Sequence, residues 1–281
     1  MGKKLDLLLI RHAESQYNRL VIDENDKQGL TQGDQYLIMY TKFRLDQKLL
    51  DADLSEIGVK QCLEGRQKLA ESLKKVKLVI TTASTRTLHT SRLLFNTEAG
   101  LPEGLRMVVI PGFERVESTC DVFCKTEDNF ERFKEFDHSI MRKEVEEFGW
   151  AWFINKFSNP GKRRRILEYV EKNAKKFDSY PSNIANGLAT TEFMKTLAPE
   201  LLEPHVEFYP RFEAILGAIR RVLSREENKD LESGEVAFVA HSTLLKYLTA
   251  KEIGDDSKPI GNWEPQNCEA KLFPFNVFAS I

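Results

Sequence analysis

Two arginines and two histidines of this sequence stand where buried β-strands should end. Arg11 and His12 directly follow one run of apolar residues, and His241 directly follows a second. Arg86 comes four residues after the end of a third. Ligands of open α/β sheets bind in the crevice beyond the carboxyl ends of the strands. If the three strands lie parallel in one sheet, we expect the four side chains to meet in one crevice.

Positive charge gathered in such a crevice needs an anion, since like charges are costly in a partly desolvated site. The planar fork of arginine matches a tetrahedral oxyanion bidentately, so Arg11 and Arg86 together can neutralise a phosphoryl group. The same charges should lower the pKa of His12, and a neutral imidazole can attack phosphorus. Taken alone, each of these residues is more often structural. The recurrence of arginine or histidine at three strand ends favours a catalytic role over a structural one.

The segments that must position these residues alternate between short apolar runs and helical patterns. Such alternation is typical of a mostly parallel sheet with helices on its faces, which is a three-layer α/β/α fold. The predicted strands cover residues 5–10, 77–82, 106–110 and 235–240.

Three helices are predicted to follow these strands. Ser55 fits an N-cap, and the helix after it is expected to turn its large apolar residues inward, namely Ile57, Leu63, Leu69 and Leu73. A second helix is expected over 86–95. The third follows His241 and has apolar residues at the spacing of a buried face, namely Leu244, Leu245 and Leu248.

Two regions depart from this alternation and are interpreted as insertions. Residues 19–50 are expected to form a long polar connection, and residues 122–204, rich in charge and aromatics, a mainly helical cap. Inside the cap, the basic run at 160–165 is interpreted as a solvated helix face rather than an anion site. A chain of 281 residues suits a single domain, 1–281, with such a cap.

The composition is that of a soluble globular protein, with 41% hydrophobic and 30% charged residues. A formal net charge of −2 gives no general attraction to nucleic acid or acidic membranes. No apolar run has the length of a membrane span or the flanks of a signal peptide, so we expect a cytoplasmic protein. The four cysteines are scattered, which argues against a disulfide framework and against zinc: Cys62, Cys120, Cys124 and Cys268.

Six short segments add a pattern of motifs to these isolated residues. The first is RHAESQYN at 11–18, and the others are DADLSEIGVKQC at 51–62, TASTRTLHTS at 82–91, FERVESTCD at 113–121, VAFVAHS at 236–242 and NCEAK at 267–271. In this order they resemble motifs of the histidine phosphatase superfamily, whose fold is called phosphoglycerate mutase-like. Ala13 and Ser242 stand where that family usually has glycine. The resemblance covers about the first 121 and the last 50 residues and leaves out the predicted cap.

The resemblance implies a role for each matching residue. His12 would be the nucleophile that becomes phosphohistidine, and the phosphate would be held by Arg11, Asn18, Arg86 and His241. Glu114 would protonate the leaving group, as a carboxyl made less acidic by burial can. Glu117 is the rival for that role. Neither a metal nor a cofactor is expected.

Three functions remain open at this point. The first is a metal-independent phosphomonoester hydrolase. A small phosphorylated metabolite is favoured over a phosphoprotein as its substrate. The second is a mutase of the phosphoglycerate type, which would reuse the phosphohistidine; the Phe-x-Gly-Trp segment of those mutases does not follow the first motif. The third is a catalytically silent relative that binds phosphorylated ligands, against which the retention of His12, Arg86 and His241 argues. The oligomeric state is not readable from the sequence.

Overall fold

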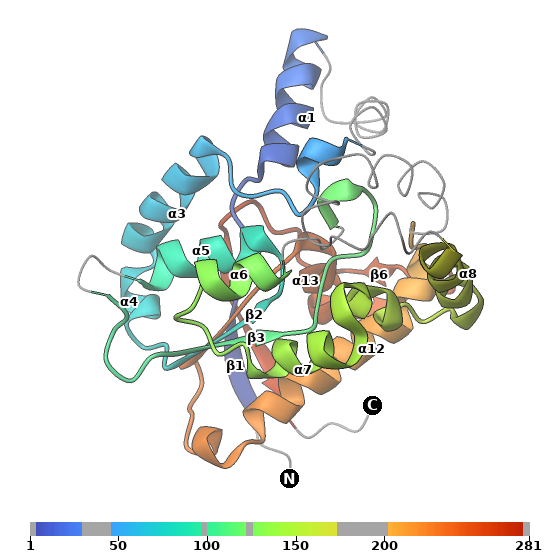
Figure 1. Ribbon diagram of the computed structural model, residues 1–281. Helices are drawn as coiled ribbons and strands as arrows, with labels where there is room; N and C mark the ends of the chain where they lie inside the picture. The colour runs from blue at the N-terminus through green and yellow to red at the C-terminus, as the bar shows by residue number, and fades with distance from the viewer. Residues whose placement is uncertain (1–3, 30–45, 97–99, 122–125, 173–201, 278–281) are drawn as a thin grey trace.

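The computed structural model describes residues 4–29, 46–96, 100–121, 126–172 and 202–277. Its centre is a five-stranded sheet in the order β3-β2-β4-β1-β7 (Figure 1). β1 pairs in parallel with β4, and β2 in parallel with both β3 and β4, whereas β7 is antiparallel to β1. The strands are β1 (Lys4–Arg11), β2 (Leu78–Thr82), β3 (Arg106–Ile110), β4 (Val236–Ala240) and β7 (Ala270–Asn276). The prediction of a mostly parallel sheet is confirmed, with the four expected strands in place to within one residue.

Alternate residues of the strands enter two apolar clusters on opposite faces of the sheet. In β1, Leu8 and Ile10 belong to one cluster, while Leu7 and Leu9 belong to the other. Every residue of β2 and β4 is buried. Parallel strands covered on both faces read as continuous apolar runs, which is why these were visible in the sequence.

Helices cover both faces, so the expected three layers are confirmed. One cluster includes residues from α5 (Thr85–Phe95), α6 (Thr126–Arg132), α7 (Ser139–Phe148), the 3-10 segment η3 (Gly149–Lys156) and α8 (Pro160–Lys172). The other includes residues from α12 (His205–Leu223) and α13 (Ser242–Thr249). α12 is a long helix that runs diagonally across the lower right of Figure 1, with α8 near its N-terminal end.

α12 and β7 were not predicted. In α12 the apolar residues Phe208, Phe212, Ile215 and Ile219 follow helical spacing, but Pro210 lies within the helix and a proline normally argues against one. β7 contains Pro274 and has only one buried residue. Proline is tolerated there because β7 is an edge strand with one neighbour.

The helix α3 (Glu56–Lys68) begins at the predicted cap, where the Ser55 hydroxyl accepts a hydrogen bond from the Gly58 amide at 2.9 Å. The prediction that its large apolar residues point inward is wrong. Ile57 and Leu63 are 39% and 40% exposed, and Leu69 and Leu73, at and beyond the end of α3, are half-buried.

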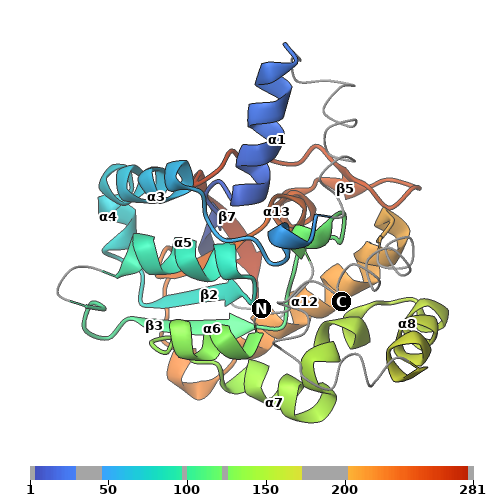
Figure 2. The same cartoon turned by 45° about the horizontal axis from the view of Figure 1, so that its top comes forward.

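The buried face of α3 consists of small residues instead, namely Gly58, Cys62 and Gly65. α3 lies beside α5 (Figure 2). A Cβ on Gly58 would lie only 2.1 Å from the backbone oxygen of Glu14. The face of α3 that is buried is therefore the one whose small residues allow another backbone to approach closely. The positions of the large apolar residues do not indicate that face.

The expected polar connection at 19–50 is wrong in its first part, because α1 (Gln16–Lys27) is a helix that projects at the top of Figure 1. Ser15 and Asn18 form a capping box at its start, and Tyr17 and Val21 are buried. Residues 30–45 lie outside the described residues.

Part of the predicted cap also lies outside the described residues, namely 122–125 and 173–201. The described part is helical over α6, α7 and α8. It joins the sheet directly, since the Asp137 amide donates to Met107 at 2.7 Å and the Val109 amide donates to Asp137 at 3.0 Å. Within the basic run, Arg164 is exposed, but Lys162 is buried and paired with Glu207.

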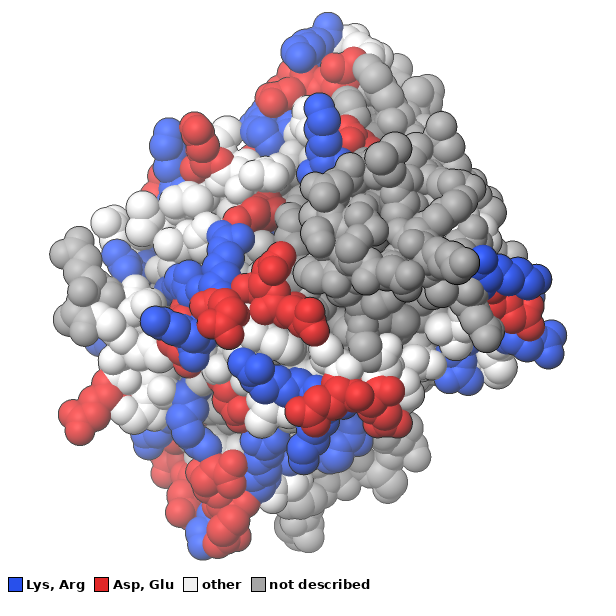
Figure 3. Space-filling view, in the orientation of Figure 1, with Lys and Arg blue, Asp and Glu red and all other residues white. Residues whose placement is uncertain are grey.

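The remaining short elements are η1 (Gln47–Leu49), α4 (Ala70–Leu73), η2 (Thr119–Asp121), η4 (Glu226–Asn228), β5 (Glu252–Ile253) and β6 (Pro259–Ile260). Acidic and basic side chains are interspersed over the described surface in Figure 3. None of the described helices has the length and apolar character needed to cross a membrane.

Candidate active site

The register of the sheet brings the predicted strand ends together. Arg11 at the end of β1 pairs with Ala240 at the end of β4. The next residues are His12 and His241, whose ring centroids lie 5.2 Å apart. The His12 amide also donates to the Ala240 carbonyl at 2.9 Å. The two histidines therefore leave the sheet as immediate neighbours.

A cavity of about 640 Å³ opens over these strand ends. Arg11, His12, Asn18, Arg86 and Glu114 all line it. Other polar residues share its wall, among them Arg115, Asp121, His205, Lys246 and Glu264. Predicted residues from three distant parts of the chain thus line one cavity. His241, from a fourth part, is not among the lining residues but contacts His12 and Arg86.

A larger hollow of about 850 Å³ lies between α6 and α7. Acidic residues and Arg132 and Arg142 line it, with no histidine among them. We place the candidate active site at the smaller cavity, because the groups able to perform group transfer gather there.

His12 is almost fully buried, and one hydrogen bond determines its tautomer. Nδ1 lies 2.7 Å from the carbonyl oxygen of Ala13, which can only accept, so Nδ1 carries the proton. Nε2 keeps its lone pair, and the Nε–H of Arg86 points at it from 3.4 Å. Burial, followed by the charges of Arg86 and Arg11, holds the pKa of His12 well below its usual value. At neutral pH the ring is therefore neutral, which is the form of an imidazole that can act as a nucleophile.

His241 has the opposite tautomer. Its Nδ1 lies 3.2 Å from Nη2 of Arg86, which can only donate, so the proton is on Nε2. Nε2 then donates to the hydroxyl of Thr82 at 3.0 Å. Burial and the neighbouring charges, first that of Arg86, lower the pKa of His241 well below its usual value. The neutral ring thus orients the Arg86 guanidinium.

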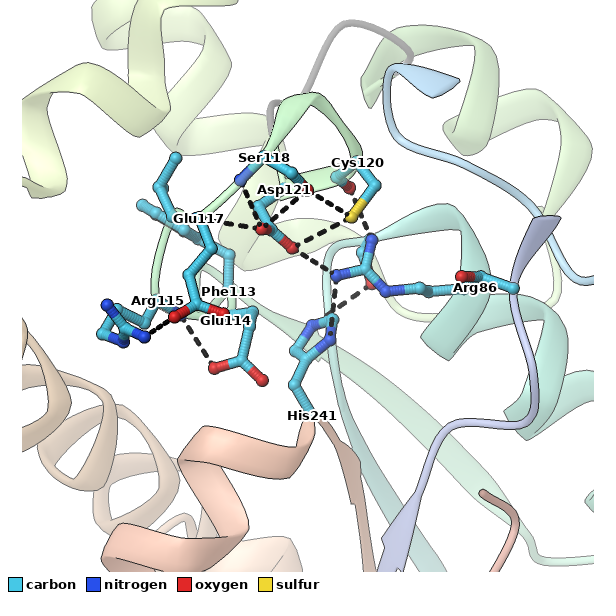
Figure 4. A network of polar contacts seen from close by, with 12 residues as sticks. Arg86, Phe113, Glu114, Arg115, Glu117, Ser118, Cys120, Asp121 and His241 are labelled. Carbon is cyan, nitrogen blue, oxygen red and sulfur yellow. Dashed lines mark hydrogen bonds and ion pairs between the residues drawn. The ribbon is translucent and has the colours of Figure 1, made fainter. Parts of the chain in front are cut away.

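Arg86 contacts both histidines. Figure 4 shows it between His241 and the loop after β3 that carries Cys120 and Asp121. Nη1 donates to the carbonyl of Cys120 at 2.5 Å, and Nη2 donates to Asp121 at 2.8 Å. The residue is 3% exposed. Three sets of contacts therefore hold the guanidinium beside His12 Nε2.

Asp121 belongs to the site although the sequence analysis assigned it no role. Its second oxygen accepts hydrogen bonds from the amides of Glu117 and Ser118, at 3.1 and 3.2 Å. It stands in one of the motif segments, FERVESTCD, so its position was visible in the sequence. Its pairing with Arg86, 35 residues away, was not predicted.

Glu114 is bound by backbone amides and has a raised pKa. Its two oxygens accept hydrogen bonds from the amides of Arg115 and Thr243, at 2.8 and 2.9 Å. Burial, followed by the negative charge of Asp121, raises the pKa of Glu114, and the two amide hydrogen bonds oppose this. The net shift is upward, toward the range in which a carboxylic acid can donate a proton at neutral pH.

Glu117 lines the same cavity but is engaged differently. Its carboxylate forms an ion pair with Arg115, and 28% of its side chain is exposed. A guanidinium thus already binds this carboxylate, whereas that of Glu114 accepts hydrogen bonds from backbone amides. The geometry therefore favours Glu114 over Glu117 as the acid.

Two further predicted residues have structural contacts of their own. The amide oxygen of Asn18 accepts from the backbone and hydroxyl of Ser15, at 3.2 and 2.9 Å, in the capping box of α1. Arg11 donates from Nη1 to the carbonyl of Pro265 at 2.9 Å. Both remain part of the cavity wall.

Within the described ranges, no three or more histidine, cysteine, aspartate or glutamate side chains are arranged to hold a metal ion.

No family model and no curated protein matches the chain. Solved structures do match. Phosphoglycerate mutase from Bacillus anthracis is 14% identical, with 98% of this chain and 90% of that chain covered and a TM-score of 0.43. The α-ribazole phosphatase from Shigella flexneri is 14% identical, with coverages of 95% and 100% and a TM-score of 0.38. A mycobacterial glucosyl-3-phosphoglycerate phosphatase is 15% identical, with coverages of 87% and 77% and a TM-score of 0.35. The chain is thus similar to a mutase and two phosphatases.

Proposed function

We propose that this protein is a phosphomonoester hydrolase of the histidine phosphatase type, acting through a phosphohistidine on His12. The observation that carries the proposal is the state of the His12 ring. Nδ1 is bound to a backbone carbonyl, so the lone pair of Nε2 is left on the side of Arg86. A histidine held only for structure has no need of a guanidinium beside its unprotonated nitrogen.

Arg86 and Arg11 would neutralise the phosphoryl group that His12 attacks. Both charges already act on His12, since both lower its pKa. Their forks match the oxygens of a transferring phosphoryl group, and a buried site strengthens that attraction. Because two guanidinium groups supply the positive charge, the proposed chemistry requires no metal.

The steps balance with the groups present. The lone pair of His12 Nε2 forms a bond to phosphorus while the ester P–O bond breaks, and Glu114 gives its proton to the departing oxygen. The Glu114 carboxylate then takes a proton from water, whose oxygen attacks phosphorus and breaks the P–N bond. Inorganic phosphate leaves and both residues return to their starting states.

The wall of the cavity favours a small polar metabolite as the substrate. Beyond the phosphate groups it presents charged side chains, among them Arg115, Lys246 and Glu264. A volume of about 640 Å³ accommodates a molecule larger than phosphate alone.

Hydrolysis of p-nitrophenyl phosphate in the presence of EDTA tests the proposal. We expect turnover by the wild-type protein and none above background by His12→Ala, with unchanged circular dichroism. Turnover that needs an added divalent metal, or that survives in His12→Ala, would refute the mechanism.

A further inference from the structure

The loop that carries Glu114 has little regular structure of its own. Residues 112–117, after β3, form neither helix nor strand. Backbone groups in a buried loop must still find hydrogen-bond partners. Those partners show what holds the carboxyl in place.

Arg211 of α12 supplies two of the hydrogen bonds. Its Nη1 donates to the carbonyl of Phe113 and its Nη2 to the carbonyl of Glu114, both at 2.9 Å. The guanidinium also lies 3.8 Å from the centre of the Phe113 ring. One buried side chain thus binds the two backbone carbonyls that flank the Cα of Glu114.

Glu203, in the segment before α12, contacts both Arg211 and the same loop. Its Oε1 accepts from Nε of Arg211 at 2.9 Å, and its Oε2 pairs with Nη2 of the same residue. Its own amide donates to the Val116 carbonyl at 3.0 Å, and its carbonyl accepts from Arg115 at 2.9 Å. Arg211 and Glu203 therefore bind the loop at four consecutive residues, from Phe113 to Val116.

A buried ion pair of this kind is a poor way to gain stability, because desolvation offsets most of the attraction. The side chains of Arg211 and Glu203 are 2% and 0% exposed. Apolar residues could fill the same space, but they could not bind the backbone groups of the loop. The pair is thus better explained by the geometry that it imposes.

We propose that Arg211 and Glu203 are positioning residues for the Glu114 carboxyl, holding the loop so that the acid reaches the leaving-group oxygen. This inference rests on the proposed function. Neither residue lines the cavity. Proton transfer requires the donor within hydrogen-bond reach of the reacting oxygen, so a small displacement of the loop is costly.

The variant Arg211→Lys tests the proposal, because lysine keeps the charge and loses the fork. We expect kcat for glycerol 2-phosphate, whose alkoxide is a poor leaving group, to fall about 100-fold. The value for p-nitrophenyl phosphate, which needs no proton donor, should fall no more than a few-fold. Glu203→Gln is a milder change, so kcat should fall less, with the same difference between the two substrates.

Arg92→Lys is the matched control. Arg92 also forms an ion pair, with Glu135, donates to a backbone carbonyl and lies 4.3 Å from the centre of a phenylalanine ring, Phe133. It does not line the cavity. We expect this variant to lose stability without any change in the ratio of the two substrates.

Hydrogen exchange supplies a readout that does not depend on activity. Amides of residues 113–117 should exchange faster in Arg211→Lys than in the wild type, and should be unchanged in Arg92→Lys. Unchanged exchange in Arg211→Lys, or equal losses of kcat on both substrates in that variant, would overturn the positioning role while leaving the proposed function intact. A wild-type protein that hydrolyses neither substrate would overturn the proposed function, and the role of Arg211 in proton donation with it.

Discussion

Arg86 and Asp121 form an ion pair of 2.8 Å inside the protein, with only 3% and 4% of their side chains exposed. Asp121 is in turn held by two backbone amides of its own loop. Removing one partner of a buried pair leaves the other charge uncompensated. Asp121 therefore fixes the position of the Arg86 guanidinium, and its charge also acts on Glu114.

Asp121→Asn should move the basic limb of the pH profile of kcat/KM to lower pH. Burial raises the pKa of Glu114 and the charge of Asp121 raises it further, so without that charge the acid loses its proton at lower pH. Steady-state kinetics from pH 5 to 9 measures the limb. As control, Asp53→Asn removes a carboxylate that pairs with Arg132 away from the cavity. A basic limb that moves equally in both variants would contradict the link between Asp121 and Glu114.

Glu114→Gln should reduce kcat for alkyl phosphates by about 100-fold or more and spare p-nitrophenyl phosphate, whose phenolate leaves readily. The same substitution at Glu117 should affect both substrates equally and weakly, since that carboxylate pairs with Arg115. The ratio of the two kcat values in each variant checks this. A selective loss in Glu117→Gln would assign the proton to that residue instead.

Phosphate, sulfate and vanadate should raise the melting temperature, since each is expected to bind the folded site, where positive charge gathers, and not the unfolded chain. Arg86→Ala should lose most of the shift, because no other group replaces its bidentate contact. Arg92→Ala serves as control for the loss of a partly buried arginine. Equal responses to phosphate in Arg86→Ala and wild type would show that Arg86 does not bind the anion.

The stability of the fold should fall as the pH drops below 6.5. His12 and His241 are buried and have lowered pKa values, so below that pH the unfolded chain binds protons that the folded chain does not. Each ring contributes up to about 1.4 kcal/mol per pH unit. Urea unfolding at pH 7.5 and 5.5 measures the change, which should be smaller in His241→Asn. An identical pH dependence in the variant would show that His241 titrates normally in the folded protein.

The parts of the fold found from sequence are those whose signal is local. β2 and β4 are continuous apolar runs because both of their faces are covered. The buried face of α3 was misjudged because it depends on the approach of another backbone, at Gly58 and Glu14. A stripe of large residues cannot report such an approach.

The residues of the candidate site also differ in how far the sequence predicts them. Parallel strands carry Arg11, His12 and His241 to one edge of the sheet, so their convergence follows from position in the sequence. The partners that tune them come from elsewhere. Arg211 reaches Phe113 across 98 residues, and neither residue carries a local mark of that contact.

The most direct test of the account is to trap the phosphoenzyme. The wild-type protein, mixed with ³²P-labelled substrate and quenched within milliseconds in alkali, should carry label that is stable to base and lost in acid, as expected for phosphohistidine. Peptide mapping should place the label on His12, and none should appear on His12→Ala. Label on another residue, or turnover by the wild type with no phosphoenzyme at any quench time, would contradict a mechanism through His12.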